Sequence, residues 1–152
     1  MNRDEIIIGS DHAGYSLKEG VKLHLQTLNC QVTDVGVWSE EPADYPDIGA
    51  MVSQRVSSGE FLRGILICGS GAGMTIVANR FRGVRAVLGC DEEAARMSRL
   101  HNDSNILVLA GRRTGLAEAL KIVQVWLETA FIGGRHELRL EKIKDLEAKI
   151  FR

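Results

Sequence analysis

The stretch GILICGSGAGMTIVANRF, residues 64–81, decides the fold of this chain. It begins with an apolar run that ends at Cys68, continues through glycines at positions 69, 71 and 73, and closes on a segment with helical spacing. A strand that is apolar throughout is typical of a sheet covered on both faces. A strand, a glycine turn and a helix in this order predict one unit of a parallel α/β sheet.

The same unit recurs along the whole chain. Each time, a short apolar run is followed by a turn and then by apolar residues at helical spacing. The predicted strands lie in residues 5–9, 30–36, 64–69, 84–89 and 105–111, and the helices after them in 15–28, 46–60, 72–81, 91–102 and 115–131, with a last charged helix over 136–151. Residues 1–152 are therefore expected to form a single α/β domain: a three-layer, doubly wound (Rossmann-like) five-stranded parallel sheet with an extra C-terminal helix.

The composition argues against several classes of protein. The formal net charge is −1 and no basic run occurs, so neither nucleic acid nor an anionic membrane surface is an expected partner. Three cysteines at wide spacing, without a Cys-x-x-Cys pair, indicate neither a disulfide framework nor a zinc site. No apolar stretch approaches the roughly 18 residues of a membrane span, and the three N-terminal isoleucines are too short a run for a signal peptide. We expect a cytoplasmic protein with reduced thiols and no bound metal.

Polar residues and glycines follow the predicted strands at the points where these strands end. Ligands of doubly wound sheets bind outside the carboxyl ends of the strands. The residues at these points are expected to meet at one edge of the sheet: Ser10, Asp11, His12, Asp44, Tyr45, Cys68 to Gly73, Cys90, Asp91, Arg112 and Arg113.

The glycine loop after Cys68 has three interpretations. A glycine turn into a helix N-terminus presents free N–H groups and favours an anion, such as a substrate group or a developing negative charge. A dinucleotide-binding module is the second, because Asp91 follows the next strand, although Met74 stands where the fingerprint requires a glycine. The third is tight packing of the strand against its helix. We favour the anion site.

Taken one at a time, the candidate side chains also have structural explanations. Cys68 alone is most simply a buried apolar residue, but its place at the ligand edge, beside a helix N-terminus, favours a thiolate. Helix capping is the commonest role of a residue placed like Asp11, and a histidine at a helix end such as His101 often meets the helix dipole. Arg135 and Arg139 share one helix face, which suits either a phosphate or solvent. A hydrolase that uses Cys68 and His101 is a further alternative, without other support in the chain.

Six stretches together resemble one known family. They stand in order and at the expected distances: GSDHAGYSLK, DYPD, ILICGSGAGM, ANRFRGVRAV, SRLHNDSNIL and GGRHELR, beginning at residues 9, 44, 65, 78, 98 and 133. Their combination is similar to the type B ribose-5-phosphate isomerases of the ribose/galactose-phosphate isomerase family, from about Ile6 to about Glu147. The resemblance implies an aldose–ketose isomerase that interconverts ribose 5-phosphate and ribulose 5-phosphate without metal or cofactor.

The resemblance also implies roles for the cysteine and its loop. Cys68 would be the general base, which moves a proton between C2 and C1 of the open-chain sugar through an enediolate. The N–H groups of residues 69–73 would stabilise the negative oxygen of the enediolate as an oxyanion hole does, and Ser70 would shuttle hydroxyl protons. Some members instead use a glutamate one residue beyond the last glycine of the loop; here that residue is Met74, which accepts no proton.

The remaining implied roles concern ring opening, substrate binding and assembly. His101 would open the sugar ring, and Arg113 is an alternative to Arg112 as a phosphate contact. The implied substrate-binding residues are Asp11, His12, Tyr45, Gly69, Gly71, Ala72, Gly73, Asn102, Arg112, Arg135 and Arg139. Members of the family are homodimers or homotetramers whose sites are shared between subunits. Allose 6-phosphate or galactose 6-phosphate is the alternative substrate within the class, because a pocket discriminates one methylene or one hydroxyl only modestly.

Overall fold

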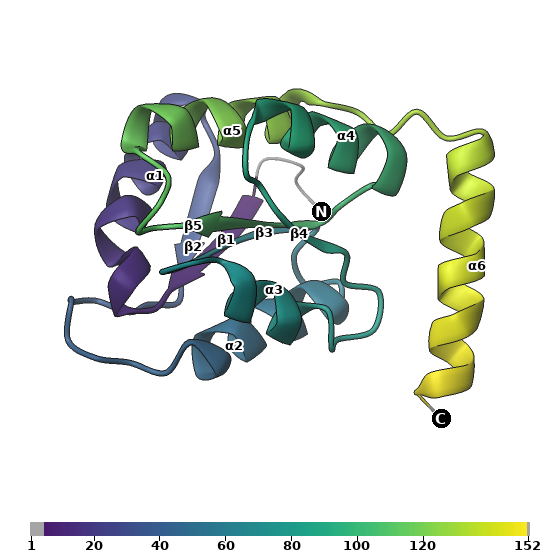
Figure 1. The fold of residues 1–152 in the computed structure, drawn as a ribbon, viewed down its shortest axis with the longest axis horizontal. Helices are drawn as coiled ribbons and strands as arrows, with labels where there is room; N and C mark the ends of the chain where they lie inside the picture. The colour runs from purple at the N-terminus through teal and green to yellow at the C-terminus, as the bar shows by residue number, and fades with distance from the viewer. Residues whose placement is uncertain (1–4, 152) are drawn as a thin grey trace.

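A computed structural model describes residues 5–151 of the chain (Figure 1). Its five strands are all parallel and form one sheet in the order β2-β1-β3-β5-β4. The strands are β1 (Glu5–Ser10), β2 (Gln31–Asp34), β3 (Arg63–Cys68), β4 (Ala86–Leu88) and β5 (Ile106–Ala110). The helices are α1 (Tyr15–Thr27), α2 (Tyr45–Ser57), α3 (Ala72–Ala78), α4 (Glu92–Asn102), α5 (Leu116–Glu128) and α6 (Arg135–Ile150), with a 3₁₀ turn η1 (His12–Gly14) before α1. The predicted doubly wound fold with an extra C-terminal helix is confirmed.

The sheet lies between two layers of helices: α1, α4 and α5 cover one face, and α2 and α3 cover the other (Figure 1). Successive side chains of a strand point to opposite faces, so Ile6 and Ile8 of β1 pack in one apolar cluster and Ile7 in the other. All three are fully buried, which is why the strand has no polar alternation. Because the strands run in one direction, the residues after them gather at one edge of the sheet, the carboxyl edge. The residues before the strands gather at the opposite, amino edge.

The boundaries differ from the predicted ones by a few residues. α2 begins at Tyr45 rather than at Pro46, with the proline in its first turn. α5 ends at Glu128 rather than at residue 131. β4 is shorter than predicted, as is usual for a strand that pairs on one side only, here with β5. These shifts leave each candidate residue at its expected end of a strand or helix.

The C-terminal helix α6 stands apart from the two layers in Figure 1, and its packing within the chain is mainly against α4. Its far end is tied to the segment before β4 by Arg82, whose guanidinium donates to the Phe151 carbonyl at 2.6 Å. Large apolar side chains of α6 remain exposed, among them Leu138 (62 %), Leu146 (55 %) and Ile150 (70 %). An apolar face of this kind is typical of a protein–protein contact. Within residues 5–151, no helix is at once long and apolar enough to cross a membrane.

Candidate active site

Cys68 is the last residue of β3 and lies at the carboxyl edge of the sheet. Its side chain belongs to the apolar cluster under α2 and α3 and is only 4 % exposed. The glycine loop 69–73 follows directly, and Gly71 adopts a left-handed conformation (φ 78°) that an L side chain rarely takes. Since α3 begins at Ala72, the thiol and the first backbone N–H groups of that helix share one end of the strand.

Arg112 is the arginine that lies against the glycine loop. The segments after β3 and β5 are joined by hydrogen bonds from the Gly111 N–H to the Cys68 carbonyl (2.7 Å) and from the Arg112 N–H to the Gly69 carbonyl (3.0 Å). The Arg112 side chain runs beside Gly69, with its Cδ 3.4 Å from the position that a Cβ there would take. Arg112, and not its neighbour Arg113, is therefore the arginine whose contacts place it beside the loop, where an anion could bind.

Tyr45, the first residue of α2, packs its ring against the other end of the glycine loop. A Cβ on Gly73 would lie 2.6 Å from Cε2 and Cζ of the ring, so a side chain at this position would displace the tyrosine. The next residue, Met74, is fully buried in the core. The glycine thus lets the tyrosine close one side of the loop, while the first side chain after the loop faces the core.

Asp11 and His12 hold the turn after β1 in place beside β3. The Asp11 N–H donates to the Ile67 carbonyl (3.1 Å), and its carboxylate accepts from the Gly14 N–H (3.1 Å), so Asp11 does cap η1. Nδ1 of His12 lies 3.0 Å from the backbone nitrogen of Ala43 and 3.2 Å from its carbonyl oxygen, so it accepts from the first or donates to the second according to the tautomer. Since Ala43 engages Nδ1 in either tautomer, the Nε2 edge of His12 is the one available to a ligand.

The loop between β2 and α2, which holds His12, is anchored by a buried ion pair. Nζ of the fully buried Lys18 lies 2.8 Å from Oδ1 of Asp34 and donates to the Val37 carbonyl at 2.5 Å. Burial alone would raise the pKa of Asp34, but hydrogen bonds from Lys18 and Lys22 outweigh this effect and hold the pKa below its ordinary value. No sequence motif pointed to this pair; the one local signal is Lys18 itself, a lysine among the buried apolar positions of α1.

His101 and Asn102 end α4 at the amino edge, on the opposite side of the sheet from Cys68. Arg85, directly before β4, donates from Nε to the Asn102 carbonyl at 3.0 Å, which places this turn beside the beginnings of the strands. From Arg63 to Cys68, β3 rises about 3.3 Å per residue, roughly 16 Å in all. The imidazole of His101 and the thiol of Cys68 in one chain therefore do not meet.

The His101 ring stacks on His136 of α6, with ring centroids 4.1 Å apart and planes at 8°. α6 also places Arg135 and, one turn later, Arg139 close enough to His136 to act on its charge. Burial lowers the pKa of His136 below its ordinary value, and the neighbouring His101, Arg135 and Arg139 lower it further. The neutral form of His136 is therefore favoured beside the two guanidinium groups.

Within one chain, the candidate residues form two separate groups. The cysteine group at the carboxyl edge consists of Asp11, His12, Tyr45, Cys68, Gly69, Ser70, Gly71, Ala72, Gly73 and Arg112. The histidine group at the amino edge consists of His101, Asn102, Arg135 and Arg139. The first offers a thiol for proton transfer with N–H groups for a negative oxygen; the second offers an imidazole and two guanidinium groups. Among the residues that the structure describes, no cluster of His, Cys, Asp and Glu is arranged to hold a metal ion.

Known proteins share both the sequence pattern and the fold. Residues 6–143 match the sequence profile of the family described as Ribose/Galactose Isomerase. The chain is 43 % identical to ribose-5-phosphate isomerase B of Escherichia coli (strain K12) over 145 residues. The aligned region covers 95 % of this chain and 97 % of that protein.

Two solved structures extend this similarity to three dimensions. A ribose 5-phosphate isomerase of Thermotoga maritima shares 49 % identity at a TM-score of 0.91, over 95 % of this chain and 99 % of that one. Ribose-5-phosphate isomerase B of Mycoplasma genitalium, solved with bound ribulose-5-phosphate, shares 38 % identity at a TM-score of 0.91, over 95 % and 96 % of the two chains. The likeness thus extends over nearly the full length of each.

Proposed function

The chain belongs to the ribose/galactose isomerase family, and from that premise we infer that it interconverts ribose 5-phosphate and ribulose 5-phosphate with Cys68 as the general base. It is an aldose–ketose isomerase of phosphorylated sugars, like its relatives named ribose-5-phosphate isomerase B. The dinucleotide-binding module and the cysteine hydrolase are therefore not retained. The observation that carries the assignment of the base is the position of Cys68, a thiol at the carboxyl end of β3 directly before a glycine loop.

The proposed reaction moves one proton between carbons and one between oxygens. The Cys68 thiolate removes the proton from C2 of the open-chain aldose. The electrons of the C–H bond form the C1=C2 double bond, and the π electrons of the C1 carbonyl move onto O1, which gives the enediolate. The thiol then returns the proton to C1, while the hydroxyl proton passes from O2 to O1 with the help of Ser70. Ser70 is exposed, and its hydroxyl already accepts the Ala72 N–H at 3.3 Å, so it lies inside the loop that faces the charge. Donors fixed in advance at a developing oxyanion lower the barrier because they need no reorganisation.

We propose that each active site combines the cysteine group of one subunit with the histidine group of another. The two groups lie at opposite edges of one sheet, yet ring opening by His101 and proton transfer by Cys68 act on the same sugar. The exposed apolar side chains of α6 support a contact with a second copy of the chain. A symmetric dimer would then carry two equivalent sites, with His12 and Arg112 from one subunit and Arg135 and Arg139 from its partner around the phosphate.

Removing the arginines of α6 is expected to weaken substrate binding more than turnover. Arg135→Ala or Arg139→Ala will raise KM for ribose 5-phosphate about tenfold to a hundredfold, since a hydrogen bond to a charged group contributes about 1.5–3 kcal/mol. The value of kcat will change less, because the phosphate is bound alike in the ground state and the transition state. Steady-state kinetics measure both constants. Lys149→Ala, at the far end of α6, is the matched control. Unchanged kinetics in a variant that carries both Arg135→Ala and Arg139→Ala would contradict the phosphate role.

The substrate assignment is tested with a panel of aldose phosphates. Purified protein is expected to convert ribose 5-phosphate to ribulose 5-phosphate with the highest kcat/KM, ahead of allose 6-phosphate and galactose 6-phosphate. Ketose formation followed by nuclear magnetic resonance gives all three rates without a coupling enzyme. A preference of about tenfold or more for a six-carbon sugar would move the assignment to that substrate. The charge of a sugar phosphate keeps it from crossing a bilayer unaided, which supports the proposal that the enzyme acts in the cytoplasm.

A further inference from the structure

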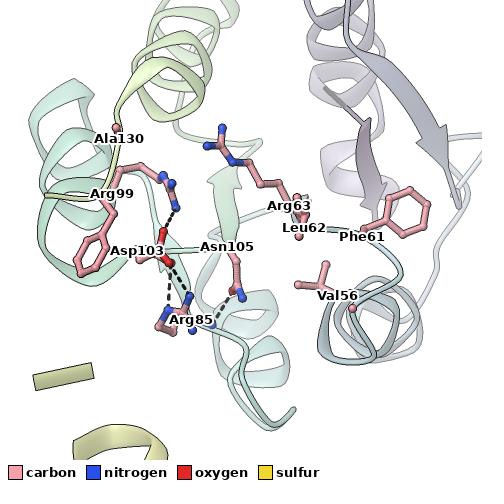
Figure 2. Close-up of a pocket in the computed structure, with 11 residues that line it drawn as sticks. Val56, Phe61, Leu62, Arg63, Arg85, Arg99, Asp103, Asn105 and Ala130 are labelled. Carbon is pink, nitrogen blue, oxygen red and sulfur yellow. Dashed lines mark hydrogen bonds and ion pairs between the residues drawn. The ribbon is translucent and has the colours of Figure 1, made fainter. Parts of the chain in front are cut away.

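A pocket of about 460 Å³ opens at the amino edge of the sheet, and Figure 2 shows the polar side chains that meet in it. The carboxylate of Asp103, directly after α4, lies between two guanidinium groups. Its Oδ1 is 2.8 Å from Nη1 of Arg99, and its Oδ2 is 3.2 Å from Nη2 of Arg85. Arg99 comes from α4 and Arg85 from the residue before β4, so Asp103 joins a helix to the edge strand of the sheet.

The same two arginines hold the backbone on both sides of this carboxylate. Nε of Arg85 lies 3.0 Å from the carbonyl oxygens of both Asn102 and Asp103. Nη1 of Arg99 donates to the Ser104 carbonyl at 2.6 Å. Asp103 itself has a left-handed backbone (φ 45°), which ends α4. Three consecutive carbonyl groups are thus fixed immediately after His101.

This network also reaches the segment that leads to α6. Nε of Arg99 donates to the Thr129 carbonyl (3.3 Å), and the Ile132 N–H donates to the Leu100 carbonyl (3.2 Å). Beyond that segment, α6 carries His136, whose ring stacks on His101. Both the backbone below the His101 ring and the ring that packs on it therefore depend on the end of α4.

We propose that Asp103 is a positioning residue for ring opening: its bridge between Arg85 and Arg99 sets the orientation in which the His101 imidazole is presented to the sugar. The inference rests on the proposed function, in which His101 opens the sugar ring. Asp103 touches neither substrate nor reacting atoms and acts only through His101. A small displacement of a group that must meet its partner at hydrogen-bond distance costs up to about a hundredfold in rate.

Helix capping alone leads to a different result. A carboxylate that only stabilised the end of α4 would change the fraction of folded protein and leave the chemistry of each folded molecule unaltered. Two reactions of the same molecules separate these cases. Isomerisation of ribose 5-phosphate requires the furanose to open. Exchange of the C1 proton of ribulose 5-phosphate with deuterated water requires proton transfer only, because the phosphate on O5 prevents this ketose from closing a five-membered ring.

The variants are Asp103→Asn and Asp103→Gly, because asparagine and glycine both tolerate the left-handed backbone at this position. His101→Asn is the reference for loss of ring opening. Glu93→Gln is the matched control, since it removes an exposed ion pair of α4, with Arg96 at 3.6 Å, in the first turn of the same helix. The measured quantity is the ratio of isomerisation to exchange, which is independent of how much of each variant is folded.

Both Asp103 variants are expected to lower this ratio about tenfold to a hundredfold, His101→Asn to lower it at least as much, and Glu93→Gln to leave it unchanged. An unchanged ratio in the Asp103 variants, with a reduced ratio in His101→Asn, would overturn the positioning role and leave the proposed function intact. An unchanged ratio in His101→Asn would overturn the ring-opening role of His101 and the inference together.

Discussion

Replacing Cys68 by alanine will lower the rate of isomerisation by about 10²–10⁴-fold, the usual contribution of a positioned general base. Proton exchange at C1 of ribulose 5-phosphate will fall by the same factor, because both reactions pass through removal of a carbon-bound proton. Met74, the first residue after the loop, does not replace the thiol, because it is fully buried and has no basic atom. Parallel measurement of isomerisation and exchange checks the expectation.

Cys90→Ala is the matched control for this substitution. Cys90 is also a cysteine just beyond a strand of the sheet, but it is exposed and no glycine loop follows it. It is expected to keep the activity of the unaltered chain. Should Cys68→Ala retain more than about a tenth of that activity, the general base must be another group.

The sequence was sufficient to predict the fold because each of its elements has a local signal. Continuous apolar strands such as residues 64–68, each followed by a turn and a helix, specify a parallel sheet with both faces covered. The same argument predicted the carboxyl edge, since residues after parallel strands gather there. The glycine loop is accordingly surrounded by Cys68, Tyr45 and Arg112. Arg112 lies against Gly69, and Tyr45 lies against Gly73.

What the sequence did not reveal depends on contacts between distant segments. α5 ends three residues before its apolar pattern does, and the Arg63 and Arg99 side chains bind the Leu127 and Thr129 carbonyls at that end. The bridge from Asp103 to Arg85 joins residues with no fixed spacing, so no local pattern announces it. The separation of His101 from Cys68 could have been predicted, since a helix that follows one parallel strand must return to the opposite edge of the sheet before the next begins.

Mixing two inactive variants is expected to restore activity if each site is shared between subunits. In a dimer of one Cys68→Ala chain and one His101→Asn chain, one site carries both substitutions and the other carries neither. Random pairing makes about half of the dimers mixed, each with one intact site of two, so about a quarter of the original activity should return. The recovery is measured after joint refolding or co-expression of the two chains, against each variant alone.

A second mixture controls for nonspecific recovery. Cys68 and Arg112 both belong to the cysteine group, and their backbones are linked through Gly69 and Gly111. A dimer of Cys68→Ala and Arg112→Ala chains therefore has one substitution in each site and no intact site, so its activity should stay near that of the Arg112→Ala homodimers that form beside it. Two opposite edges of one sheet can serve one sugar only across a subunit boundary. If the first mixture recovers no more activity than the second, His101 of one subunit does not act in the same site as Cys68 of the other. That result would contradict the proposal of a shared site.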